Sequence, residues 1–285
     1  MMMIKWTLAI GAVLLLTGTT LAQVDQGYHE ARAAVAAPHE TSYTGPTSAE
    51  QANLNGLPDF RVYEDVAIKK TKFFGFLLPL VQAENARLDQ VRLRLSHIRD
   101  RQRWQQGMTP DDVAWLAKIQ AEFGISDEDT STSDFWTAIL TRVDAIPEEL
   151  VLVQAANESA WGTSRFAREG NNLFGQWCFE EDCGIVPAGR PQGETYEVAR
   201  YGSVPESIGS YLHNLNTGRT YTKLRQLRAQ MRAIGAKPSA AKLATGLGRY
   251  SQRGDAYVKE LQAMIRVNSK VIDQVRVSGT PEGTI

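Results

Sequence analysis

The sequence predicts an α+β protein that is mainly helical. Apolar residues recur at helical spacing, as at Leu88, Val91, Leu95 and Ile98. Helix-start signals recur as well, because Pro110 occupies a first helical position and residues 203–206 have the pattern of a capping box. Residues 194–201 show the alternation that is typical of a strand. The β part is therefore expected to be small.

Composition excludes several classes of protein. The chain has 285 residues, 43% of them hydrophobic, and its 31 Lys and Arg against 32 Asp and Glu give a net charge of −1. This length allows one or two domains with a sizeable core. A dedicated nucleic-acid binder needs an excess of positive charge, so no nucleic-acid partner is expected. Collagen-like, disulfide-scaffold and wholly disordered classes also fail on composition.

The N-terminus has the order of a secretory signal. A single positive charge in residues 1–5 precedes the apolar run 8–16, and Thr20-Leu21-Ala22 is a small-residue cleavage pattern. Residues 1–22 are therefore expected to be a signal peptide or, if uncleaved, an N-terminal anchor in which residues 4–22 tether the protein to a membrane. Residues 23–58 lack apolar periodicity and are expected to form a flexible linker.

Residues 59–133 are expected to form a helical N-terminal extension, which Pro79 should kink or interrupt. Its basic residues could contact an anionic lipid or a cell-wall polymer, but a solvated charged face is the favoured interpretation. These residues are Arg87, Arg92, Arg94, Arg99, Arg101 and Arg103.

Residues 134–272 are expected to form the domain that carries the candidate catalytic residues, and residues 273–285 a disordered tail. The helix that starts at Pro147 should be buried nearly all round, yet it contains Gln154 and Glu158 on one side. Apolar surroundings and the negative end of the helix both disfavour an ionised Glu158, which would raise the pKa of a general acid. The alternative is a carboxylate that reaches water at a helix end.

Aromatic residues cluster soon after Glu158. Rings beside a protonatable carboxyl suit a sugar, because they stack on its apolar faces while amides and carboxyls bind its hydroxyls. Aromatic core packing is the alternative, and it is favoured for Phe174. The candidate substrate-binding residues are Gln154, Trp161, Asn172, Phe174, Trp177 and Tyr221, the last of which could equally be a packing residue.

The two cysteines favour a disulfide. Cys178 and Cys183 are close in sequence, and an exported chain enters an oxidising compartment. The alternative is a cysteine nucleophile working with His213, although no local nucleophile signature is present. The histidines are isolated or lie in the polar N-terminal segment, so no metal and no organic cofactor is expected.

Two motifs resemble those of the bacterial cell-wall glucosaminidases, glycoside hydrolase family 73. These are residues 154–164, Gln-Ala-Ala-Asn-Glu-Ser-Ala-Trp-Gly-Thr-Ser, and residues 171–175, Asn-Asn-Leu-Phe-Gly. Within that family the chain is most similar to the Bax-like group of Gram-negative bacteria. The resemblance implies a lysozyme-like fold with a helical lobe, a small β-hairpin lobe and a cleft between them. It implies Glu158 as the general acid, peptidoglycan glycan strands as the substrate, and a periplasmic location.

The second catalytic group is less evident. The resemblance places a hairpin at residues 184–201, with strand 184–188, turn 189–193 and return strand 194–201, but the first strand has no acidic residue. We therefore choose Glu197, while the substrate's own acetamido group could make a second carboxyl unnecessary. Other candidates are Glu180, Glu181, Asp182 and Glu194.

The resemblance also implies that Tyr250, within residues 247–251, lines the cleft near the acid; Tyr257 is expected to be a packing residue. The predicted activity is hydrolysis of the β-1,4 bond after N-acetylglucosamine. The competing hypotheses are a lytic transglycosylase or muramidase on the same fold, and a non-enzymatic wall-binding protein.

Overall fold

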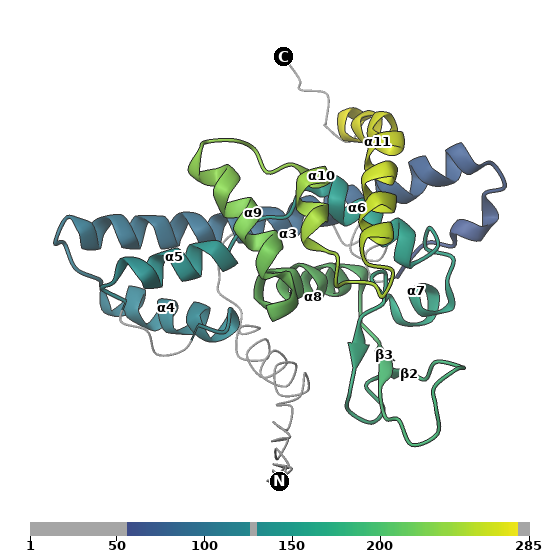
Figure 1. Ribbon diagram of the computed structural model, residues 1–285, viewed down its shortest axis with the longest axis horizontal. Coiled ribbons are helices and arrows are strands. Elements are labelled where there is room, and N and C mark those ends of the chain that lie inside the picture. The colour runs from purple at the N-terminus through teal and green to yellow at the C-terminus, as the bar shows by residue number, and fades with distance from the viewer. Residues whose placement is uncertain (1–55, 126–129, 279–285) are drawn as a thin grey trace, which may run out of the picture.

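The computed structural model describes residues 56–125 and 130–278 (Figure 1). The predicted signal or anchor, residues 1–22, lies outside the described residues, and so does nearly all of the predicted linker. The structure is mainly helical, with one small antiparallel sheet. Its elements are η1 (Phe60–Val62), α3 (Val66–Arg103), α4 (Pro110–Glu122), α5 (Ser133–Arg142), α6 (Glu148–Glu158), α7 (Arg165–Gly170), β1 (Trp177–Cys178), β2 (Gly184–Ile185), β3 (Glu197–Ala199), α8 (Val204–Thr217), η2 (Arg219–Tyr221), α9 (Thr222–Ala233), α10 (Ala240–Leu243), η3 (Ala244–Gly246) and α11 (Asp255–Ser278).

Helix α3 runs for 38 residues, so Pro79 does not interrupt it; an interruption was one of the two outcomes expected at that position. Proline removes one backbone donor and crowds the carbonyl of the residue four positions earlier, which costs about 3 kcal/mol in a helix interior. That earlier residue is Gly75, which has no side chain, and Leu77, Leu78 and Leu80 are all buried beside the proline. Burial of this apolar stretch outweighs the missing hydrogen bond.

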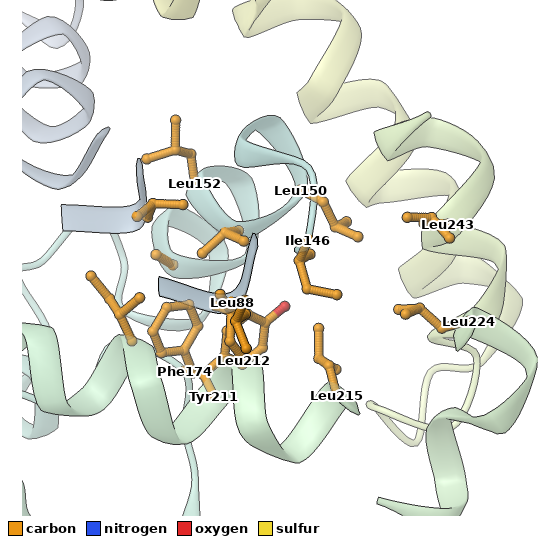
Figure 2. Packing of buried hydrophobic residues seen from close by; sticks show 14 of the residues in the cluster. Leu88, Ile146, Leu150, Leu152, Phe174, Tyr211, Leu212, Leu215, Leu224 and Leu243 are labelled. Atoms are coloured by element: carbon orange, nitrogen blue, oxygen red, sulfur yellow. The ribbon is translucent and has the colours of Figure 1, made fainter. Parts of the chain in front are cut away.

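The core is centred on α6. Leu150 to Val153 are fully buried, as the apolar sequence of this helix predicts, and α6 packs against α3, α10 and α11. Figure 2 shows Leu150 and Leu152 of α6 beside Leu88 of α3 and Leu212 of α8. The helical N-terminal extension therefore contributes to the same core as the residues that follow it.

The sheet has three strands in the order β1-β3-β2, one more than the expected hairpin. Gly184 of β2 pairs with Ala199 of β3, in the expected antiparallel sense, and Cys178 of the additional strand β1 pairs with Glu197. The sheet projects from the helical body in Figure 1. Cys178 and Cys183 form the predicted disulfide, with their Cα atoms 6.1 Å apart.

The C-terminal helix α11 extends to Ser278, so the disordered tail predicted from residue 273 is wrong for residues 273–278. Ile272 and Val275 are buried on this helix, which explains why it continues. The remaining tail residues lie outside the described part of the chain. Among the described residues, no helix has both the length and the apolar character needed to cross a lipid bilayer.

Candidate active site

Helix α6 ends at Glu158 because the backbone turns sharply after it. Ala160 and Trp161 both have positive φ, at 50° and 60°, and Gly162 follows with a φ of 75°. The hydroxyl of Ser159 accepts a hydrogen bond from the Gly162 N–H at 2.7 Å and so fixes this turn. The helix therefore stops four residues before Gly162, and Glu158 lies at its C-terminal end.

A chain of hydrogen bonds runs through the protein to Glu158. The Tyr211 hydroxyl donates to Oε1 of Gln154, and Nε2 of Gln154 donates to the Tyr257 hydroxyl at 2.9 Å. The Tyr257 hydroxyl in turn donates to Oε1 of Glu158 at 2.7 Å. Because Gln154 fills the acceptor side of the Tyr257 hydroxyl, the proton of that hydroxyl points at Glu158.

This direction assigns different roles to the two oxygens of Glu158. Oε1 accepts the hydrogen bond from Tyr257, so a proton carried by the carboxyl resides on Oε2. Oε2 faces Gly175, where an added Cβ would lie 3.9 Å away. Gly175 has a φ of 64°, a conformation that favours glycine. The arrangement therefore holds one oxygen and leaves the other as the donor.

Burial raises the pKa of Glu158 above its ordinary value. The hydrogen bond from Tyr257 opposes this shift, because it favours the ionised form. Two charged side chains of the α11 region act in opposite directions: Glu260 raises the pKa of Glu158 and Arg253 lowers it. Burial and the nearby Glu158 raise the pKa of Tyr257, so its hydroxyl keeps its proton. A raised pKa is the direction that a general acid requires.

The Asn-Asn-Leu-Phe-Gly segment builds the support for this chain. The side-chain amide of Asn172 donates to the carbonyls of Gln176 and Ala199, both at 2.8 Å, and thereby fixes the loop after α7. Phe174 stacks on Tyr211 with ring centroids 3.9 Å apart and an angle of 6° between the planes. Figure 2 shows these two rings together in the core. The motif therefore positions the first member of the hydrogen-bond chain.

Comparisons with known proteins show to which family the chain belongs. The family model Glucosaminidase, described as mannosyl-glycoprotein endo-beta-N-acetylglucosaminidase, matches residues 135–270. The chain is 32% identical over 225 residues to the protein bax of Escherichia coli (strain K12), which covers 79% of each of the two chains. The chain belongs to the Bax-like glucosaminidase family. Membership indicates a glycosidase, and the matched range contains Glu158 and both motifs. No solved structure gave a significant match.

Most of the predicted substrate-binding residues of this Bax-like chain are corrected by their burial. Gln154, Asn172 and Phe174 are between 0% and 2% exposed, so their side chains contact protein. Tyr221 is 9% exposed, and its ring centroid lies 6.1 Å from that of Tyr250, as the packing alternative predicted. Gln154, Asn172 and Phe174 therefore contact protein and support Glu158 and its hydrogen-bond partners, as the packing alternative predicted for Phe174.

The two candidate tryptophans, Trp161 and Trp177, lie in different surroundings. Trp161 lies edge-on to Phe73 and Phe74 of α3, with centroids 5.6 Å and 5.2 Å away, so its ring packs on the helical body. Trp177 is 48% exposed, and its ring lies edge-on to Tyr196 at 4.9 Å. Among the six candidates, Trp177 is the one with an exposed side chain, while Trp161 is half-buried.

Tyr250 was expected near Glu158 and Tyr257 in the packing of the helices, but Tyr257 is the residue that contacts Glu158. The Tyr250 hydroxyl donates to the Phe174 carbonyl at 2.5 Å, and its ring stacks on Tyr257 with an interplanar angle of 2°. Tyr257, expected to be a packing residue, binds Glu158 directly. No motif marks Tyr257, but a buried tyrosine needs a partner for its hydroxyl, and that requirement was the available signal.

Glu197 does not have the contacts expected of a second catalytic group. It is only 5% exposed, and its Oε2 accepts a hydrogen bond from the Gly184 N–H at 2.8 Å. Its Oε1 lies 3.7 Å from Arg190. These contacts hold β2 to β3. Among the described residues, Glu197 and the two cysteine sulfurs form one group close enough to hold a metal, but the disulfide removes the thiolates that such a site requires.

Proposed function

We propose that this protein is a peptidoglycan hydrolase, an endo-β-N-acetylglucosaminidase in which Glu158 is the general acid. The single observation that supports this most directly is the oriented hydrogen-bond chain from Tyr211 through Gln154 and Tyr257 into Oε1 of Glu158. It leaves Oε2 to deliver a proton to the glycosidic oxygen. The substrate would be the glycan strands of peptidoglycan, with cleavage after N-acetylglucosamine and water as the final acceptor.

In the proposed reaction the two carboxyl oxygens of Glu158 act differently. Oε2–H gives its proton to the leaving oxygen while the bond to the sugar C1 breaks. The resulting Glu158 carboxylate keeps the hydrogen bond from Tyr257, which stabilises its new charge. Because the carboxylate of Glu197 binds Gly184 within the sheet, we propose that the substrate's acetamido oxygen attacks C1. Water then opens this intermediate, returning a proton to Glu158.

We further propose that the protein acts in the periplasm. The signal-like order of residues 1–22 and the Cys178–Cys183 disulfide both support export into an oxidising compartment. If the signal stays uncleaved, residues 4–22 would hold the enzyme at the inner membrane beside its substrate.

Digestion of purified sacculi tests this function. Wild-type protein is expected to release fragments with a reducing N-acetylglucosamine end, identified by mass spectrometry, and a Glu158→Gln variant is expected to release none. The control is Glu64→Gln, which changes an exposed carboxyl just before α3. Equal release by wild type and the Glu158 variant would refute the proposal.

A lytic transglycosylase or muramidase is the second candidate, because such chemistry also needs only one protein carboxyl at the acid position. The engagement of Glu197 within the sheet is the observation that favours it. It predicts anhydro-N-acetylmuramic acid or reducing N-acetylmuramic acid at the new ends. A non-enzymatic wall-binding protein would bind sacculi and release no fragment.

A further inference from the structure

A hollow of about 980 Å³ is lined by residues of α3, α5 and α9. Figure 1 shows α5 on the opposite side of the molecule from β2 and β3. The lining is mixed: Trp136 and Leu140 are apolar, and other side chains carry guanidinium, amide and hydroxyl groups. The described residues that line it include no carboxylate; the polar side chains are Arg92, Arg99, Gln102, Arg103, Gln105, Ser131, Ser133, Thr137, Thr141 and Arg232.

The basic residues of α3 divide into two groups. Arg94 and Arg101 both reach Asp112 of α4, with Arg94 at 3.5 Å, and Arg87 pairs with Glu84 at 2.9 Å. These side chains are balanced by carboxylates. Arg92, Arg99 and Arg103 instead point to the hollow on the other side of the helix.

Two arginines near the hollow donate hydrogen bonds to carbonyls at the C-terminal end of α5. Arg92 donates to the Val143 carbonyl at 2.8 Å, and the buried Arg228 donates to the Thr141 carbonyl at 2.9 Å. Carbonyls at the end of a helix carry negative partial charge, so these two arginines stabilise that end. They are structural residues.

The remaining arginines keep unused donors. Arg232 binds Asp144 through Nη2 at 2.8 Å and through Nε, and Arg99 binds Asp100 through Nη2 and Nε, so Nη1 of each has no bond among the described residues. Arg103 has no ion pair within the described part of the chain. Among the described residues, the ion pairs of the four arginines that line the hollow, Arg92, Arg99, Arg103 and Arg232, involve two carboxylates, Asp100 and Asp144.

We propose that this hollow is a binding site for a small oligoanion, a molecule with two or more carboxylate or phosphate groups. Planar guanidinium forks match both groups in two-pronged hydrogen bonds, and the neighbouring hydroxyls supply further donors. The volume is at the upper end of ordinary small-ligand sites, which run to roughly 1,000 Å³. The charge could come from the peptide carboxylates of the cell wall or from a phosphorylated compound. The site does not depend on the glycosidase function.

Titration of the full chain with two probes, tricarballylate and tripolyphosphate, separates these sources. The readout is the indole N–H signal of Trp136, assigned with a Trp136→Phe variant, because this ring lines the hollow and donates to Gln102 at 3.0 Å. Saturable displacement of that signal by either probe at 150 mM salt supports the site. The tighter probe names the source, and the neutral disaccharide chitobiose should leave the signal unchanged. Displacement by neither probe overturns the proposal.

The matched variants are Arg99→Gln with Arg103→Gln, and, as the control, Arg266→Gln with Lys270→Gln. Both remove two positive charges, but the control residues are exposed on α11. The first pair is expected to weaken binding at least tenfold, and the control pair less than twofold. Equal weakening by both pairs would show that net charge alone attracts the anions and would reject the site. Circular dichroism and Tm verify that each variant is folded.

Discussion

Glu158 and Glu197 are both withdrawn from water, yet their surroundings prepare them for different tasks. Glu197 is 5% exposed, and its oxygens accept a hydrogen bond from a backbone N–H and lie near a guanidinium, contacts that join β2, β3 and the loop between them. Glu158 meets the hydroxyl of Tyr257 and the distant amide of Asn157, and burial raises its pKa. The comparison teaches that burial depth alone does not separate a candidate acid from a structural carboxylate. The groups that each carboxylate contacts separate the two.

The same difference is visible in the two parts of the structure that hold these residues. The hydrogen-bond chain to Glu158 joins α6, α8 and α11, which are far apart in the sequence. The contacts of Glu197 stay within the small sheet and its loops. Substitutions in the helical hydrogen-bond chain should therefore change catalysis, while substitutions of the Glu197 contacts should change the local stability of the sheet.

Glu158→Gln is expected to have the largest effect, lowering glycan cleavage by about 10³-fold because the proton donor is lost. Folding should survive, since the amide can still accept the hydrogen bond from Tyr257. The folded-state pKa of Glu158 is raised, so the wild-type protein loses stability as pH rises from the unfolded-state pKa through the folded one. The Glu158→Gln variant has no carboxyl to ionise at this position, so its Tm at neutral pH should slightly exceed that of wild type. A lower Tm, measured by calorimetry, would contradict the pKa argument.

Sequence reasoning could predict the fold class and the burial of α6 because both depend on local patterns. The apolar run of α6 predicts its burial, and a motif surrounds Glu158, the predicted acid. It could not identify Tyr257, which reaches Glu158 across 99 positions of the chain. It also assigned Asn172 to the substrate, because motif residues look alike whether they contact the ligand or support the residues that do, whereas the core packing favoured for Phe174 is what the structure shows. The third strand β1 was missed because a two-residue strand leaves no periodicity to detect.

Tyr257→Phe is expected to have the next largest effect. It removes the hydrogen bond that orients Glu158 and stabilises the carboxylate formed in the reaction, so kcat should fall about 10- to 100-fold. Because that bond lowers the pKa of Glu158, its loss should raise this pKa and move the alkaline limit of activity to higher pH. The pH profile is the measurement. A fall in kcat with an unmoved limit would mean that Tyr257 has only a packing role.

Glu197→Gln should have a small effect on cleavage, within about threefold, because a glutamine can still accept the Gly184 hydrogen bond. The weakened contact with Arg190 should cost about 0.5–1 kcal/mol of stability, measured by urea unfolding. If Glu197 instead activates water, cleavage should fall by about 100-fold or more while stability changes little. Glu194→Gln, an exposed position near the same strand, is the control.

Glu260→Gln is expected to have the smallest effect, and its sign is opposite to that of Tyr257→Phe. Glu260 raises the pKa of Glu158, and its ion pair with Arg253 at 2.7 Å partly balances that cation. Removing the carboxylate leaves Arg253 to act alone, so the pKa of Glu158 should fall and the alkaline limit of activity should move to lower pH. The control is Arg253→Gln, which should move the limit to higher pH. Two variants that moved it in the same direction would show that the α11 charges do not act on Glu158 through its electrostatic surroundings.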